Sequence, residues 1–141
     1  MKDYYWQRLY YKIIKICYEN ENNLNLEKYD CYRCITPPRI SVLDYMAYLE
    51  TWWQPSDSTT FGVAEALLER FLKVQKLYLK FNNVHRILLV TLLIATKWND
   101  DFLKPLQYYA KIGGVDKKEL SSLERKFLKH LNYNIFVNNL S

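Results

Sequence analysis

One segment constrains the fold of this chain more than any other, because residues 83–98 are apolar on every side of a helix. When these residues are projected at about 100° per residue, apolar side chains surround the axis: Ile87, Leu88, Leu89, Val90, Leu92, Leu93, Ile94, Ala95 and Trp98. A helix that is apolar all round lies inside a bundle rather than on its surface. The apolar run is too short to span a bilayer. We therefore expect an all-α domain with this helix at its centre and no membrane partner.

Two helices of the predicted bundle come directly before the central one. Ser41 followed by Asp44 resembles a capping box, which begins a helix over 42–53. A second helix over 60–77 follows a run of serine, aspartate and threonine. The apolar stripes are Val42, Tyr45, Met46, Leu49, Trp52 and Trp53 in the first, and Phe61, Ala64, Leu68, Phe71 and Leu72 in the second. Each stripe predicts a face buried against neighbouring helices.

Two shorter patterns predict helices after the central one. Residues 104–112 accept Pro105 at their first position and end at a glycine pair, 113–114. Asp116 with Glu119 is another capping box, and the helix that it begins runs to about Leu131. The predicted domain is thus a five-helix bundle around a buried third helix.

The N-terminal part of the chain has a different character. Residues 3–19 read as a tyrosine-rich helix, and an asparagine cluster over 20–25 then breaks the helical pattern. We expect a linker up to residue 40, so the predicted division is 1–40 for a detached helix with its linker, 41–137 for the bundle and 138–141 for a tail. The leading helix is expected to pack on the bundle, and contact with a partner is the alternative.

Composition narrows the possible functions. The chain has 141 residues and a net charge of +5, which is far from the dense basic clustering of a nucleic-acid binder. Its three glycines form neither a Walker loop nor a dinucleotide fingerprint, so no nucleotide cofactor is expected. The three cysteines suit a reducing compartment, and the first residues lack a signal-peptide pattern. We expect the protein in the nucleus, the cytoplasm or both.

Metal and catalytic sites have weak support. Cys31 and Cys34 have the spacing of half a zinc site, but no second pair follows, and Cys17 with a distant histidine completes it poorly. His85 reads as part of a helix start and His130 as an exposed or packed histidine. With two histidines in the chain, no catalytic triad can be assembled with adequate support. We therefore assign no catalytic residue, no metal and no cofactor.

Two charged residues stand out on the predicted helices. Glu124 falls within the apolar face formed by Leu120, Leu123, Phe127, Leu128 and Leu131. A carboxylate there needs a cation or strong donors, because burying it unpaired costs several kcal/mol. Lys97 is the complementary anomaly, a cation in the last turn of the buried helix. One interpretation is an internal ion pair, and the other is a pair of charges at the rim of a groove that receives a partner's helix.

Four motifs in order resemble a cyclin box. They are residues 83–86 (Asn-Val-His-Arg), 95–101 (Ala-Thr-Lys-Trp-Asn-Asp-Asp), 108–115 (Tyr-Tyr-Ala-Lys-Ile-Gly-Gly-Val) and 123–128 with its Leu-Glu and Phe-Leu pairs. The chain is most similar to short P-type or U-type cyclins, which are associated with phosphate-signalling kinases. Residues 40–77 support the resemblance more loosely. Where the P-type pattern usually has arginine, this chain has Tyr48, so any ion pair made by that arginine is in doubt.

The resemblance implies a function. In cyclins, a lysine and a glutamate at the positions of Lys97 and Glu124 hold backbone groups of the regulatory helix of a cyclin-dependent kinase. Asp100 and Asp101 are expected to lie in a solvated turn that caps the next segment. The alternative is that one of these carboxylates meets the arginine cluster that binds a phosphorylated activation loop in other kinases.

We therefore expect a non-catalytic, activating subunit that forms a heterodimer with a cyclin-dependent protein kinase. Its kinase-binding residues are Lys97, Glu124, Asp100 and Asp101. The alternative is a module that binds nucleic acid or protein and resembles the cyclin fold of transcription factor IIB. The dispersed lysines and arginines argue against a nucleic-acid partner.

Overall fold

A computed structural model gives the fold and describes residues 2–34, 36 and 38–133. Its helices are α1 (Lys2–Glu19), the 3-10 helix η1 (Glu27–Tyr32), α2 (Val42–Trp53), α3 (Thr59–Gln75), α4 (Val84–Asn99), α5 (Leu106–Gly113) and α6 (Lys117–His130). These residues contain no strand, which confirms the all-α prediction. The end of the predicted bundle, at 137, and the predicted tail, 138–141, lie outside the described residues.

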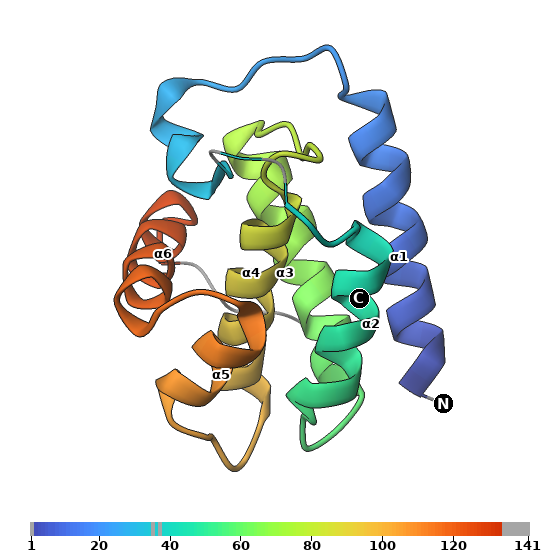
Figure 1. The fold of residues 1–141 in the computed structure, drawn as a ribbon, viewed down its shortest axis with the longest axis vertical. Helices are drawn as coiled ribbons and strands as arrows, with labels where there is room; N and C mark the ends of the chain where they lie inside the picture. Colours follow the sequence, from blue (N-terminus) through green and yellow to red (C-terminus); the bar gives the residue numbers. More distant parts are fainter. Residues whose placement is uncertain (1, 35, 37, 134–141) are drawn as a thin grey trace.

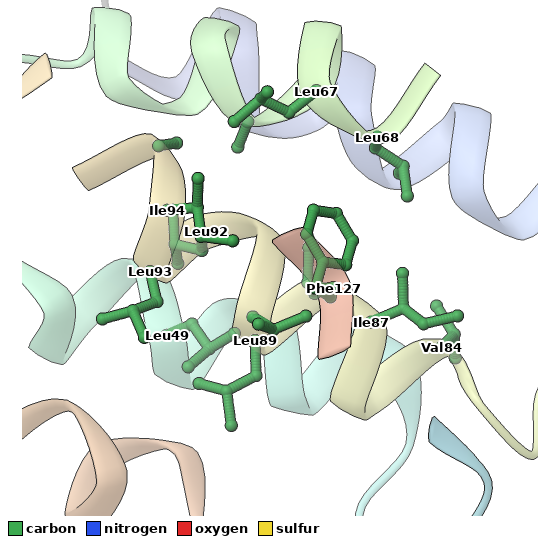
Figure 2. Packing of buried hydrophobic residues seen from close by; sticks show 14 of the residues in the cluster. Leu49, Leu67, Leu68, Val84, Ile87, Leu89, Leu92, Leu93, Ile94 and Phe127 are labelled. Atoms are coloured by element: carbon green, nitrogen blue, oxygen red, sulfur yellow. The ribbon is translucent and has the colours of Figure 1, made fainter. Parts of the chain in front are cut away.

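Helix α4 is the centre of the bundle, as predicted. Every residue from 84 to 96 except Arg86 is buried, and α3, α2 and α6 pack around it (Figure 1). Figure 2 shows Leu49 of α2, Leu67 of α3 and Phe127 of α6 surrounding the leucines of α4. Because each fully buried leucine contributes about 1.5–3 kcal/mol, this helix anchors the core.

The predicted caps begin α2 and α6. The Ser41 hydroxyl accepts a hydrogen bond from the Asp44 amide at 3.1 Å, and the Asp116 carboxylate accepts one from the Glu119 amide at 2.7 Å. Gly114 caps the C-terminal end of helix α5, with a φ of 76° in the left-handed region that glycine adopts at little cost. At Gly113 a Cβ would lie 2.5 Å from Leu89 of α4, so a glycine lets α5 approach the central helix.

The predicted detachment of the N-terminal helix is wrong. The face of α1 that carries Trp6, Leu9, Ile13 and Cys17 is buried in the same core as the bundle, against α3 and α2. Packing on the bundle, the expected role of this helix, is confirmed. The physical reason is that the apolar residues of α1 recur at helical spacing and form a continuous stripe, and burying this stripe in the core stabilises the fold.

The expected linker over 20–40 also contains ordered structure. Helix η1 lies within it and buries Tyr29 and Tyr32, the latter with no exposed surface, beside the end of α6 (Figure 1). The division of the chain at residue 40 stays a prediction, although the residues on both sides share one core.

Two tryptophans of the predicted apolar stripes are exposed. Trp52 is 52% and Trp98 41% accessible. Trp52 lies at the edge of its stripe, whereas Trp53, the last residue of α2, is 1% exposed. Trp98 lies beyond the buried part of α4, which ends at Thr96. Leu72, also placed in a stripe, is half-buried. In the described part of the chain, no helix combines the length and the apolar character needed to cross a membrane.

Candidate protein-interaction site

The two charged residues singled out from the sequence form an ion pair. Lys97 Nζ in the last turn of α4 lies 2.6 Å from Glu124 Oε2 of α6. The glutamate side chain is 15% exposed and the lysine side chain 43%. The helical wheel predicted Glu124 within the apolar face and in need of a cation; in the structure its side chain is largely buried and Lys97 is its partner. The pair stands at the surface where α4 and α6 meet.

Exposed apolar side chains follow Lys97 in the sequence. Trp98 follows Lys97, and the loop that leaves α4 exposes Phe102 and Leu103 by 83% and 51%. On α6, Leu128 is half-buried one turn after Glu124. Large exposed apolar groups next to charged groups are typical of surfaces that bind other proteins. The groove that we predicted between the two helices stays a prediction.

A second ion pair joins the same two helices. Arg86 Nε in the first turn of α4 donates to Glu119 Oε2 at 2.6 Å, and Arg86 Nη1 donates to Cys34 Sγ at 2.8 Å. Burial alone would lower the pKa of Arg86, but the bonds to Glu119 and Cys34 raise it above its usual value. Both glutamates of α6 therefore pair with α4. The sequence predicted a capping role for Glu119 but not its ion pair with Arg86.

Asp100 and Asp101 have different surroundings. The Asp100 carboxylate accepts hydrogen bonds from the Ser56 amide at 3.0 Å and from the Thr60 hydroxyl at 2.5 Å, so it joins the end of α4 to the start of α3. Its contacts are thus with a preceding helix, whereas a cap on the following segment was expected. Asp101 is exposed. A role of either residue in binding a kinase stays a prediction.

A buried carboxylate on α3 was missed. Glu65 has a side chain only 7% exposed, and its two oxygens accept from Arg8 at 2.9 Å and Lys12 at 2.7 Å, both on α1. Lys12 also pairs with Glu69. A signal was present in the sequence, because Glu65 lies four residues after Phe61 and three before Leu68, on the stripe predicted to be buried.

The histidines make structural contacts. His85 is buried in the first turn of α4, and its Nε2 donates to the Ile40 carbonyl at 2.9 Å, while its Nδ1 is buried without a partner. Burial lowers the pKa of His85 most, and nearby Arg86 lowers it further. His130 is half-buried and hydrogen-bonds to the Tyr32 hydroxyl. The predicted place of His85 at a helix start is confirmed.

The cysteines are free thiols. Burial raises the pKa of Cys17 to about 12, and burial also raises the pKa of Cys31. The residues that the structure describes contain no group of three or more histidine, cysteine, aspartate or glutamate side chains placed to hold a metal ion.

Known proteins are similar to this chain in sequence. The family model Cyclin matches residues 14–135, from within α1 to beyond α6. Cyclin-U4-3 of Arabidopsis thaliana is 31% identical over 129 residues, which cover 90% of this chain and 58% of the relative. Cyclin-U3-1 of Arabidopsis thaliana is 34% identical over 102 residues, 72% of this chain and 46% of that protein.

A rice relative gives the same result. Cyclin-P4-1 of Oryza sativa subsp. japonica is 32% identical over 107 residues, which cover 75% of this chain and 50% of the relative. The chain thus spans about half the length of the curated relatives that it matches. These matches confirm the resemblance to U-type and P-type cyclins that four sequence motifs predicted. Because the family model covers most of the residues and the helical bundle agrees with it, the chain belongs to the cyclin family.

Proposed function

We propose that this chain is a regulatory, activating subunit of a cyclin-dependent protein kinase and that the surface where α4 meets α6 binds the regulatory helix of the kinase. The observation that carries the proposal is the Lys97–Glu124 ion pair, which is 2.6 Å long and partly open to solvent. Exposed apolar residues follow Lys97 in the sequence. Membership of the cyclin family supports it. In this proposal the chain has no catalytic residue and acts in the nucleus or the cytoplasm.

The ion pair keeps hydrogen-bonding capacity for a partner. An ammonium group has three N–H donors and a carboxylate has two acceptor oxygens. The contact between Lys97 and Glu124 uses one donor and one oxygen. The remaining lysine donors suit the carbonyl groups at the end of a partner helix, and the second glutamate oxygen suits a backbone N–H. Such contacts fix the register and orientation of that helix.

Activation follows from the position of the bound helix. An active kinase needs the ion pair between the lysine of its β3 strand and the glutamate of its movable αC helix. A subunit that binds the inward position of that helix more tightly than the outward one shifts the kinase toward its active conformation. Apolar contacts supply most of the affinity in this proposal, and Lys97 with Glu124 supply the orientation.

The test compares two matched pairs of charges on the same two helices. Lys97→Ala and Glu124→Ala are expected to abolish co-purification with the kinase and its activation. They should change the free energy of unfolding by no more than about 1 kcal/mol, because the pair is partly exposed. The kinase is identified first by affinity purification with the wild-type chain from native extract and mass spectrometry.

Glu119→Gln is the matched control. It breaks an ion pair of equal length, 2.6 Å, between the same helices. Because Arg86 is in the first turn of α4 and Lys97 in its last turn, the change should leave kinase binding intact. If Lys97→Ala and Glu124→Ala unfold the chain while kinase pairing by the folded fraction is unaltered, the pair is structural and the proposal fails. The family match does not favour the factor-IIB-like alternative, which predicts DNA binding that falls steeply with salt.

A further inference from the structure

A second surface, away from the ion pair of α4 and α6, has the features of a ligand site. A cavity of about 850 Å³ opens where η1, the end of α3 and the end of α6 meet. This volume lies in the range of small-molecule sites. Its walls carry three lysines, one histidine and two carboxylates: Lys28, Lys126, Lys129, His130, Glu27 and Asp30.

The lysines of this cavity keep their positive charge unpaired within the described part of the chain. Lys126 and Lys129 form no ion pair there, and neither Glu27 nor Asp30 pairs with any of the three lysines. Lys28 has its ammonium 5.0 Å from the centre of the Tyr29 ring and 3.5 Å from the Gln75 amide oxygen. Lys129 and Lys126 near the end of α6 partly complement the helix dipole, but Lys28 comes from another element.

His130 lies beside these charges. Burial lowers the pKa of His130 most, and Lys28, Lys129 and Lys126 each lower it further. Glu27 and Asp30 line the same cavity, so its walls carry three cationic and two anionic side chains. The excess of lysine leaves the wall with a net positive charge of one.

A buried tyrosine holds the His130 ring beside the cavity. Tyr32 has no exposed surface, and its hydroxyl lies 2.8 Å from His130 Nδ1. A side-chain hydrogen bond also joins Tyr32 and Cys31. Because a buried polar group without a partner costs about 1–3 kcal/mol, these contacts hold the imidazole in the wall of the cavity.

We propose that this cavity binds a small molecule carrying phosphate groups, with the ammonium groups of Lys28, Lys126 and Lys129 as donors and His130 in the wall beside them. Several donors from different directions suit a multiply charged tetrahedral oxyanion, and charge-assisted bonds of lysine to phosphate are strong. The volume leaves room for a molecule larger than a single phosphate group. The site is independent of the kinase proposal, because it uses none of the same residues.

Calorimetric titration of the full chain with tripolyphosphate at constant ionic strength tests the site. Orthophosphate and a nucleoside triphosphate are run in parallel to separate an inorganic from an organic source. Saturable binding is expected, and Lys126→Gln with Lys129→Gln should weaken it about tenfold or more through the loss of two charge-assisted contacts. Lys117→Gln with Lys118→Gln is the matched control, because it removes the same charge from the other end of α6 and should change affinity less than about twofold.

A second measurement locates the ligand. Nuclear magnetic resonance titration of the two imidazoles should show the pKa of His130 rising when tripolyphosphate is bound, because an anion favours the charged ring. The pKa of His85, on α4, should not move. The proposal is overturned if the control pair weakens binding as much as the test pair, if a poly-glutamate peptide of equal charge binds as well, or if binding leaves the pKa of His130 unchanged.

Discussion

Glu65 on α3 and Glu124 on α6 interrupt apolar stripes in the same way, yet the fold gives them different surroundings. Glu65 lies 2.7 Å from Lys12 and Glu124 lies 2.6 Å from Lys97, so the two contacts are nearly equal in length. Glu65 also binds Arg8, and its side chain is 7% exposed. Glu124 is 15% exposed and, among the residues that the structure describes, has Lys97 alone as its ion-pair partner.

The difference separates a structural cluster from a surface available to a partner. The two cations of α1 satisfy both oxygens of Glu65 and close over it. Within the described residues, one oxygen of Glu124 and most of the Lys97 donors remain without a partner, and the chain after Lys97 exposes apolar groups. A carboxylate on an apolar stripe therefore does not indicate a binding site by itself. The burial of the carboxylate and the number of its ion-pair partners decide whether it belongs to a structural cluster or to an accessible surface.

The largest expected effect comes from removing the cations of α1. Arg8→Ala with Lys12→Ala leaves Glu65 buried without an ion-pair partner on α1, which should lower the free energy of unfolding by about 3 kcal/mol or more. Urea denaturation measures the loss. Adding Glu65→Leu to the same chain should restore most of the stability, because an apolar side chain of similar size replaces the buried charge. If the triple variant stays as unstable as the double one, the cluster acts through packing of α1 instead.

A smaller effect is expected at the pair of aspartates after α4. Asp100→Ala removes the acceptor of two hydrogen bonds at the start of α3 and should cost about 2 kcal/mol of stability by thermal denaturation. Asp101→Ala should change stability by no more than about 0.5 kcal/mol, because the residue is exposed. Asp101→Asn tests a kinase contact, for which we expect lower activation. Unchanged activation would remove that role.

The smallest effect concerns the alkaline limit of the α1 cluster. Burial alone would lower the pKa of Lys12. The hydrogen bonds and negative charges of Glu65 and Glu69 outweigh burial, so the pKa lies above its usual value of 10.5. A raised pKa in the folded state means that this contribution to stability is present below pH 10.5 and is lost as pH rises through the folded pKa. The stability of the wild type should therefore fall more than that of Lys12→Gln above pH 10.5, as chemical denaturation at several pH values measures. Equal pH dependence of the two chains would contradict it.

The fold was largely predictable because local rules and burial agreed. The all-round apolar pattern placed α4 at the centre, and Ser41 and Asp116 correctly indicated where α2 and α6 begin. Helix α1 was expected to be detached because asparagines follow it, but a polar connection says nothing about whether the helix returns to the core. The exposure of Trp52 and Trp98 was missed because a helical wheel gives the direction of a side chain but not how far the neighbouring helices cover it.

The candidate site was partly predictable. The wheel identified Glu124, and the position of Lys97 at the end of a buried helix suggested its partner, which the ion pair confirms. Glu65 carried the same signal and was passed over. The pairing of Arg86 with Glu119 gave no local signal, because the residues are far apart in the sequence and each has an ordinary helical role.

The sequence by itself determined which segments are α-helical, which of them is central and which charged residues are out of place on an apolar face, because these depend on periodicity and residue chemistry along one element. Only the tertiary structure decided that η1 forms, which charges meet, which are closed off and which lysines line one cavity with His130. The reason is that ion pairs and cavities form between elements, and their distance and exposure follow from how helices pack rather than from any single stretch of chain.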